Sequence, residues 1–281
     1  MDRRMKKPPP SLLFPGAFST GRGLPSQHKA VFSLCFVLCL VLWSVGAPYA
    51  MASPITIQGP ETQVQLVELF TSEGCSSCPR ADATLVDLED HPDLWRTFAP
   101  IGLHVDYWDR LGWRDRFATI RNGQRQRNYA RAGLASGVYT PGWFVGGQEW
   151  HGWFTGQSLP LGSPIQIGSL GVVVDGDHVS VHTADVTLAK MARRVHVAII
   201  GTGLTSRVRR GENRGRTLNH GFVALAQTQA AFASGSAELD LPKQDVDDRP
   251  TRRAVVVWVT RGDNPIPLQV AGGWLPTGAA Q

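Results

Sequence analysis

Cysteine is scarce in this chain of 281 residues, and its scarcity excludes several kinds of site. Of the four cysteines, Cys35 and Cys39 fall in an N-terminal segment that we expect to be removed. The remaining pair, Cys75 and Cys78, supplies only two of the four ligands that a structural zinc site needs, and no second cysteine pair exists. The sequence therefore predicts no bound metal and no cofactor.

An excess of charge is also missing from most of the chain. Of the 28 basic and 23 acidic residues, six and one fall in residues 1–52, which leaves 22 of each sign in the remainder. The pI of about 9.3 therefore describes mainly the N-terminal segment. Because nucleic-acid binding needs a surplus of basic residues, the composition predicts no nucleic-acid partner.

Residues 1–52 have the pattern of a secretory signal peptide. Four basic residues among the first seven precede an apolar run at residues 30–47, and Ala50-Met51-Ala52 has the A-x-A form of a cleavage site. We expect cleavage after Ala52, with Ala50 as the alternative. An uncleaved membrane anchor is the other interpretation, since 18 mostly apolar residues nearly span a bilayer. Cleavage would leave a periplasmic or secreted protein that meets the membrane only transiently, through its signal peptide.

Residues 64–147 alternate between strand and helix patterns, which predicts an α/β domain at residues 60–168. A buried strand at residues 64–70 ends at a Ser/Gly turn, and Cys75 and Cys78 follow at the start of a helical pattern. This order is typical of a dithiol redox centre on a thioredoxin-like fold. The predicted helices span residues 79–90 and 116–132, and the other strands span residues 101–105 and 143–146.

Residues 169–281 have strand patterns and few helical ones, and they are predicted to form a C-terminal β-rich subdomain. Residues 171–182 read as a hairpin around Asp175-Gly176. Residues 152–169 before it read as loop, and no internal repeat or long low-complexity tract follows. Further strands are expected at residues 195–200, 222–226, 237–241, 254–260 and 266–270.

The cysteine pair carries the clearest chemistry. Cys75 lies before the first helical turn, where unpaired N–H groups and the helix dipole favour a thiolate, so we expect it to be the attacking nucleophile. Cys78 lies one turn further on and would resolve the mixed disulfide. Three alternatives stay open: a permanent structural disulfide, a metal-binding pair and an inert remnant.

Two further segments complete the predicted site. Pro141 directly precedes a strand and is expected to be cis and to face the cysteines, with the backbone of Thr140 holding the substrate. An ordinary trans proline is the alternative. Glu68 lies within the apolar strand, where a buried carboxylate would exchange a proton with the resolving thiol. A solvated carboxylate at a sheet edge is the alternative for Glu68.

Several other polar residues have ambiguous patterns. The aromatic and acidic stretch at residues 104–115 is expected to be mainly structural, although His104 and Asp106 are possible metal ligands. Residues 211–220 form a polar turn whose Asn213, Arg214 and Arg216 either cradle an anion, dock one part of the chain onto the other, or do neither. The arginines of residues 116–132 are expected to form a solvated face; they are Arg121, Arg125, Arg127 and Arg131.

Together, these motifs resemble the DUF1223 family. The stretch at residues 67–79, with Ala81-Asp82, carries the resemblance, as do residues 104–109, 125–130, 138–141 and 211–220. The resemblance implies a thioredoxin-like fold and bacterial export, but no established reaction. Gly142 and the residues after it depart from the family pattern, and residues 152–169 lack the closing helix that it leads us to expect.

The sequence therefore predicts an exported thiol–disulfide oxidoreductase or redox-responsive protein that acts on protein or small thiol and disulfide substrates. Cys75, Cys78, Pro141 and Glu68 would be its catalytic residues, and Thr140 would bind the substrate. A Cu(I)- or zinc-handling protein is one alternative. A non-enzymatic envelope binding module is the other.

Overall fold

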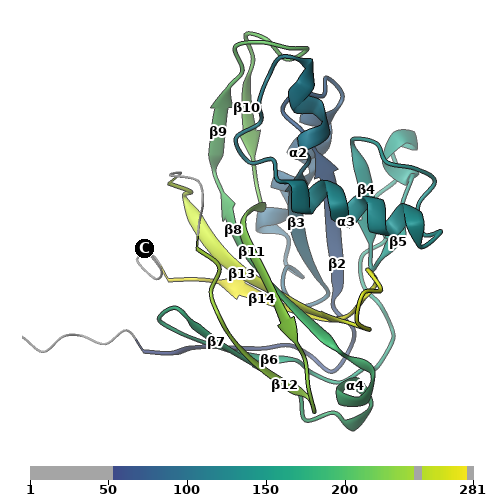
Figure 1. Cartoon of the computed structure of the whole chain (residues 1–281), viewed down its shortest axis with the longest axis vertical. Helices are drawn as coiled ribbons and strands as arrows, with labels where there is room; N and C mark the ends of the chain where they lie inside the picture. Colours follow the sequence, from purple (N-terminus) through teal and green to yellow (C-terminus); the bar gives the residue numbers. More distant parts are fainter. Residues whose placement is uncertain (1–52, 244–248, 277–281) are drawn as a thin grey trace, which may run out of the picture. The chain divides into compact units, whose positions relative to one another are not determined.

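An eight-stranded mixed sheet organises residues 53–243 and 249–276, the parts that the computed structural model describes (Figure 1). Its order is β14-β13-β8-β11-β3-β2-β4-β5, and β3 pairs in parallel with both β2 and β11. The strands are β2 (Gln65–Thr71), β3 (Phe98–His104), β4 (Gly142–Val145), β5 (Gln148–Glu149), β8 (Arg194–Thr202), β11 (Val223–Ala231), β13 (Arg252–Thr260) and β14 (Pro267–Trp274). The predicted signal peptide, residues 1–52, lies outside the described residues.

Two smaller sheets accompany the large one. A four-stranded sheet has the order β1-β6-β7-β12, and a hairpin pairs β9 with β10. Their strands are β1 (Ile55–Gln58), β6 (Gly171–Asp175), β7 (His178–His182), β12 (Ser236–Asp240), β9 (Leu204–Arg207) and β10 (Thr217–His220). The described residues thus form a mixed α/β structure that is mostly sheet with few helices.

The helical elements are short. The α-helices are α2 (Cys78–Val86), α3 (Ile120–Arg131) and α4 (Val186–Met191), and the 3₁₀ turns are η1 (Asp87–Asp90), η2 (Asp106–Leu111) and η3 (Gly152–Thr155). Pro79 lies in the first turn of α2, where its missing N–H costs no hydrogen bond. Helix α3 begins where the Thr119 side chain accepts from the Asn122 amide, and Gly133 follows its end with a φ of 71°. Helix α2 with η1 matches the predicted helix at residues 79–90, and α3 lies within the one predicted at residues 116–132, whereas α4 was not predicted.

The large sheet is buried on both faces at its centre. In β13, Val256 and Trp258 belong to the core that contains Tyr129 of α3, whereas Val255 and Val257 belong to the core beside the four-stranded sheet. This alternation follows from the period of two along a strand. It explains why β13 is apolar almost throughout, as strands covered on both faces are.

The sheet continues across the predicted boundary between residues 168 and 169. Strands β8, β11, β13 and β14 come after that boundary, yet they extend the sheet that contains β2, β3 and β4. Strand β1 (Ile55–Gln58) likewise comes before the predicted first domain, which begins at residue 60, yet it pairs with β6 of the predicted C-terminal part. The two predicted parts of the chain therefore share their sheets, because strand periodicity indicates which face is buried but not which strand is the neighbour.

Candidate functional site

The loop between β2 and α2 places the two cysteines at the start of a helix. The Cys75 amide donates to Ser72 O at 3.1 Å, and the Cys78 amide donates to Cys75 O at 3.3 Å. Cys78 is the first residue of α2, and Cys75 lies in the turn before it. Both are free thiols. The predicted placement of the pair at a strand-to-helix junction is confirmed.

The two thiols have opposite pKa shifts. A hydrogen bond from Cys78 and a smaller one from Ser77, whose Oγ lies 3.3 Å from the Cys75 sulfur, outweigh burial and lower the pKa of Cys75 to about 6. Burial, together with the neighbouring Cys75 and Asp82, raises the pKa of Cys78 well above its usual range. At neutral pH the pair therefore holds one thiolate and one thiol, which is the division that an attacking and a resolving cysteine require.

The turn before β4 faces this pair. The Thr140–Pro141 peptide bond is cis, as predicted, and Pro141 is buried. The sulfur of Cys75 lies 3.8 Å from the carbonyl oxygen of Thr140. The structure thus brings Cys75, Cys78, Thr140 and Pro141 together, while the roles of Thr140 and Pro141 toward a substrate stay predictions.

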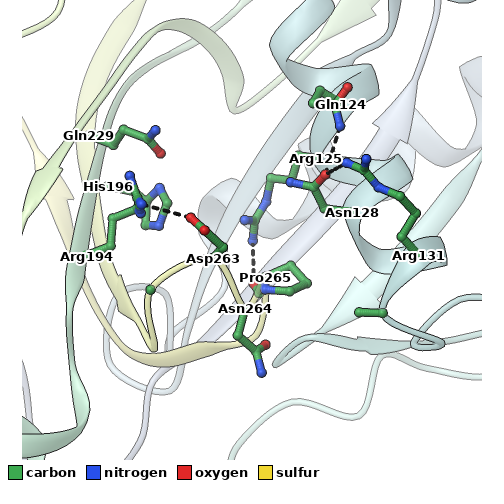
Figure 2. Close-up of a pocket in the computed structure, with 12 residues that line it drawn as sticks. Gln124, Arg125, Asn128, Arg131, Arg194, His196, Gln229, Asp263, Asn264 and Pro265 are labelled. Atoms are coloured by element: carbon green, nitrogen blue, oxygen red, sulfur yellow. Dashed lines mark hydrogen bonds and ion pairs between the residues drawn. The ribbon is translucent and has the colours of Figure 1, made fainter.

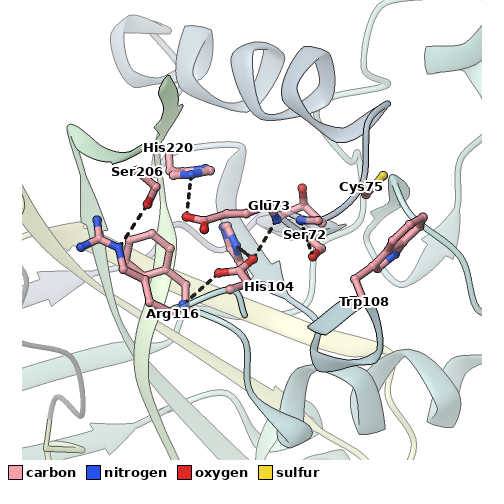
Figure 3. Close-up of polar contacts among 12 residues, drawn as sticks. Ser72, Glu73, Cys75, His104, Trp108, Arg116, Ser206 and His220 are labelled. Carbon is pink, nitrogen blue, oxygen red and sulfur yellow. Dashed lines mark hydrogen bonds and ion pairs between the residues drawn. The ribbon is translucent and has the colours of Figure 1, made fainter. Parts of the chain in front are cut away.

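An indole ring lies next to the cysteine loop. Cys75 is only 1% exposed, and Trp108 of η2 packs against the loop at Gly74 (Figure 3). Trp108 Nε1 donates to Thr140 Oγ1 at 2.8 Å, and a Cβ on Gly74 would lie 3.2 Å from that of Trp108. The aromatic stretch at residues 104–115 therefore contributes directly to the site, although the sequence suggested a mainly structural role.

Glu68 is buried, but it does not lie beneath the cysteines. Its Oε1 accepts from Arg125 Nε at 2.5 Å, and its Oε2 accepts from the Tyr129 hydroxyl at 2.6 Å. Thr71, three positions along β2, points to the opposite face and donates to Asp82 Oδ1 at 2.7 Å. Because an odd separation along a strand reverses the face, Glu68 faces α3 and Thr71 faces α2. The acidic neighbour of the pair is thus Asp82, and the predicted position of Glu68 is wrong.

Five buried titratable residues lie behind the cysteine loop, and we name them the acid–histidine cluster. They are Glu73, Asp82, His104, Asp115 and His220. Two separate contacts organise the cluster. His104 Nδ1 lies 2.7 Å from Asp115 Oδ2, and His220 lies between Glu73 and Asp82. The cluster joins the end of β2, helix α2, strand β3 and the end of β10.

The cluster shifts the acidity of its own members. Burial disfavours charge on His104, but Asp115 and the other carboxylates outweigh it and raise the pKa of His104 to about 9. Burial alone would raise the pKa of Asp115, yet His104 and two backbone amides lower it. Burial raises the pKa of Asp82 despite opposing contributions from His220 and His104. His104 and Asp115 thus form an ion pair, while Asp82 gains a proton more readily than an ordinary aspartate does.

The loop between β9 and β10 docks onto the cysteine loop. Asn213 Nδ2 donates to the carbonyl oxygens of Glu73 at 2.9 Å and Cys75 at 2.8 Å. Arg216 donates to Asn213 Oδ1 at 2.7 Å and orients this amide. The docking alternative for residues 211–220 is therefore the correct one. In Figure 1 the β9–β10 hairpin lies beside α2.

Sequence reasoning missed four residues of this site: Glu73 as a buried group, Asp82, Trp113 and His220. Trp113 Nε1 donates to Glu73 Oε2 at 2.7 Å. The sequence position of Asp82 could have indicated that it lies near the cysteines, since it follows Cys78 by one helical turn. Nothing in the sequence indicated this for His220, because only the docking of the β9–β10 hairpin brings it to the cysteines.

A separate cavity of about 590 Å³ lies between α3, β8, β11 and residues 262–265 (Figure 2). Its lining includes Arg125, which donates to Pro265 O at 3.2 Å, and Arg194, which pairs with Asp263 at 2.8 Å. Arg125 is thus an internal ion-pair residue and not part of the predicted solvated face, whereas Arg121 and Arg131 are exposed. No cysteine lines this cavity.

Two further findings concern residues 53–243 and 249–276 only. None of the helices there is long and apolar enough to cross a membrane. Within the same residues, no group of three His, Cys, Asp or Glu side chains is arranged to hold a metal ion. His104 and Asp106, named above as candidate ligands, belong to no such group.

Comparisons with known proteins place these features in context. A sequence model described as "Protein of unknown function (DUF1223)" matches residues 66–260. Protein AGR_C_4864 from Agrobacterium tumefaciens, a solved structure, is 24% identical, with a TM-score of 0.53 over 79% of this chain and 100% of that chain. HBP35 of Porphyromonas gingivalis is 15% identical, with a TM-score of 0.48 over 79% of this chain and 80% of that one. No curated protein matches the chain. At these identities the first likeness bears on the fold alone.

Proposed function

The chain belongs to the DUF1223 family, for which no function is defined, and on that premise we propose that it is a thiol–disulfide oxidoreductase. One observation carries the proposal: the Cys75 sulfur, with a pKa of about 6, lies 3.8 Å from Thr140 O while the Cys78 thiol has a raised pKa. A nucleophilic thiolate beside a resolving thiol is the arrangement that disulfide exchange uses.

We extend the proposal to the fold around the pair. Parallel strands β2 and β3 are joined through α2, and β4 runs antiparallel to β2 with Thr140 at its start. This arrangement supports a thioredoxin-like architecture for the region around the cysteines. The other strands of the sheet and the β9–β10 hairpin would then be additions to that architecture.

The proposed reaction has two steps. The Cys75 thiolate attacks a disulfide RS–SR′, which forms a Cys75–S–S–R bond and releases R′S⁻. Cys78 then loses its proton and attacks the Cys75 sulfur, which forms the Cys75–Cys78 disulfide and releases RS⁻. The dithiol gives up two electrons, the substrate disulfide gains them, and the two released thiolates take up protons. The reverse sequence oxidises a dithiol, and the reduction potential of the pair decides between the two directions.

Asp82 takes the role that the sequence suggested for Glu68. It follows Cys78 by one turn of α2, it is buried, and it is one of the charges that raise the pKa of Cys78. A carboxylate whose pKa is itself raised accepts a proton more readily near neutral pH than an ordinary carboxylate does. We therefore propose Asp82 as the group that accepts the Cys78 proton in the second step.

We propose that access to Cys75 involves movement of Trp108. The thiol is 1% exposed, and Trp108 bonds to Thr140, whose carbonyl oxygen lies 3.8 Å from the Cys75 sulfur. The 3₁₀ turn η2 that carries Trp108 ends at Gly112, whose φ of 101° suits glycine alone, and residues 110–112 are exposed. The substrate would then displace Trp108 and occupy the position beside Thr140 and Pro141.

The proposed setting is the bacterial periplasm or the exterior. As a signal peptide, residues 1–52 would direct export to an oxidising compartment, where protein or small-molecule disulfides are available as substrates. We propose that the exported protein uses Cys75 and Cys78 as its only redox groups. No specific observation favours the alternative roles in Cu(I) or zinc handling or in envelope binding.

A trapping experiment tests the proposal. A Cys78→Ser variant should accumulate mixed disulfides through Cys75 in the native host, because the resolving thiol is missing. Cys75→Ser/Cys78→Ser is the matched control and should trap nothing. Absence of mixed disulfides from cells that express Cys78→Ser at wild-type levels would refute the proposed exchange reaction.

A further inference from the structure

One buried histidine stands between two carboxylates directly behind the cysteine loop. His220 Nε2 lies 3.3 Å from Glu73 Oε1 (Figure 3). On the other side of the ring, His220 Nδ1 lies 3.7 Å from Asp82 Oδ2. The three side chains are at most 6% exposed. These four atoms have no hydrogen-bond partner among the described residues. Since buried polar groups are nearly always hydrogen-bonded, four facing atoms without such bonds need a functional explanation.

The three residues come from separate elements that meet only here. Glu73 lies in the loop two residues before Cys75, Asp82 lies on α2 one turn after Cys78, and His220 ends β10. The remaining oxygens are already engaged: Asp82 Oδ1 accepts from Thr71, and Glu73 Oε2 accepts from Trp113. Each carboxylate therefore keeps one free oxygen, and that oxygen faces a different nitrogen of the same ring.

We propose that His220 is a proton-relay residue that carries the proton of Cys78 from Asp82 to Glu73 during disulfide exchange. This inference rests on the proposed oxidoreductase function and adds His220 and Glu73 to it. A neutral imidazole suits this task because one ring nitrogen can accept a proton while the other releases one.

The proton balance of the resolving step is simple. As the Cys78 sulfur attacks Cys75 and RS⁻ leaves, the Cys78 proton moves to Asp82. Asp82 passes a proton to His220 Nδ1, and the proton on His220 Nε2 moves to Glu73. Glu73 later returns its proton to solvent, and RS⁻ gains one from solvent. His220 ends in the other tautomer and regains the first by the reverse transfer when the disulfide is reduced again.

The charges that surround His220 favour uptake of this proton. Glu73 and Asp82 face its two nitrogens, the His104 ring lies edge-on with centroids 5.0 Å apart, and Asp115 lies behind His104. The relay requires a neutral His220, so with His104 charged the three carboxylates of the cluster outnumber its one imidazolium group. Burial makes uncompensated negative charge costly, and the proton from Cys78 reduces it. His104 is committed to Asp115, which leaves His220 as the histidine free to exchange protons.

A static ion pair is the competing explanation for the same geometry. Both explanations predict that removal of His220 destabilises the fold, so stability cannot distinguish them. Only a relay makes the second step of the reaction depend on His220 while the first step does not. The two steps can be followed separately with the aromatic disulfide 5,5′-dithiobis(2-nitrobenzoate), which releases one coloured thiolate per step.

The experiment compares His220→Gln with wild type and with His196→Gln in rapid-mixing measurements. His196 is a suitable control because it is also largely buried, stacks on Trp258 and bonds to Thr260, away from the cysteines. We expect His220→Gln to slow the second release about 100-fold, the lower range for general acid–base catalysis. The first release should change less than about twofold, because Cys75 attacks without the relay, and His196→Gln should alter neither release.

A second release in His220→Gln that is as fast as in wild type would overturn the relay and leave the oxidoreductase proposal intact. If wild type itself gives only one release, Cys78 does not resolve, and the oxidoreductase proposal fails together with the relay. If His220→Gln does not fold, a measurement on the wild-type protein still tests the relay. The rate of its second release should depend non-linearly on the fraction of D₂O, since several protons move together, and a rate that is the same in D₂O would overturn the relay.

Discussion

Glu212 Oε2 accepts a hydrogen bond of 3.0 Å from the backbone amide of Ser76, the residue that follows Cys75. The docked loop between β9 and β10 therefore places a carboxylate at the N-terminal end of α2, where unpaired amides would otherwise favour a thiolate. The hairpin thus acts on the cysteine loop in two ways. Asn213 holds the backbone of the loop, and Glu212 places a negative charge on the amide next to Cys75.

Glu212→Gln should lower the pKa of Cys75 further. The substitution removes a negative charge near the thiolate and weakens the hold on the Ser76 amide. We expect a decrease of about half a pKa unit, since a partly exposed charge contributes about 0.2–1 kcal/mol and one unit corresponds to about 1.4 kcal/mol. Thiolate absorbance measured against pH reports the shift. Asp240→Asn, which removes an exposed carboxylate from β12, is the control, and an equal shift in both variants would contradict a local effect.

Cys78→Ala should move the pKa of Cys75 in the opposite direction. The hydrogen bond from Cys78 is the largest of the effects that lower the pKa of Cys75 to about 6, and alanine cannot donate one. The pKa should therefore rise by more than about one unit, which corresponds to about 1.4 kcal/mol. Cys78→Ser keeps a donor and should give a smaller rise. The pH dependence of alkylation of the single remaining thiol measures both, and an unchanged pKa in Cys78→Ala would show that the helix start alone acidifies Cys75.

Trp108→Phe should expose Cys75. Phenylalanine lacks the indole N–H that donates to Thr140 Oγ1, so the ring beside the cysteine loop loses its attachment to Thr140. A neutral hydrogen bond is worth about 0.5–1.5 kcal/mol net, which predicts alkylation of Cys75 about two- to tenfold faster at saturating pH. Trp153→Phe removes an indole N–H that bonds to Thr84 and should leave the rate unchanged. A rate in Trp108→Phe no higher than in wild type would mean that other groups control access.

The His104–Asp115 pair should make stability depend on pH. The pKa of His104 is raised to about 9 in the folded protein from about 6.5 in an unfolded chain. Its stabilising contribution is therefore complete below about pH 6.5 and is lost as the pH rises toward 9. Asp115 has a lowered pKa, so its contribution is lost in acid.

Urea unfolding at several pH values between 6 and 10 checks this prediction. The free energy of unfolding of the wild type, minus that of His104→Gln, should fall across that interval by an amount on the order of 3 kcal/mol. The difference is the informative quantity, because the lowered pKa of Cys75 makes both proteins gain stability as the pH rises through the same interval. A difference that is constant from pH 6 to 9 would mean that His104 is not charged in the fold.

The sequence identified the cysteine pair and its facing turn because both depend on local signals. Cys-x-x-Cys after an apolar strand and before Pro79 marks a helix start, and Pro141 directly precedes β4. These features are confined to short stretches of chain, where periodicity and turn chemistry are informative.

The parts that the sequence could not predict depend on long-range packing. The face of β2 that turns toward α2 is set by tertiary contacts, so the pattern alone could not exclude Glu68 or favour Asp82. His220 lies 142 positions after Cys78 in the printed sequence and reaches the site only because the β9–β10 hairpin docks beside α2. The continuation of the sheet beyond β3 has the same origin, since β11 pairs with β3 across more than one hundred residues.

The rate of alkylation of Cys75 as a function of pH, with the modified residue identified by mass spectrometry, tests the central claim most directly. We predict that Cys75 alone reacts at neutral pH and that its rate rises with a midpoint near pH 6, the pKa of its thiol. A midpoint near the ordinary thiol pKa of about 8.5, or no reaction until the protein unfolds, would contradict the account, because Cys75 would then be a covered structural residue and not a nucleophile.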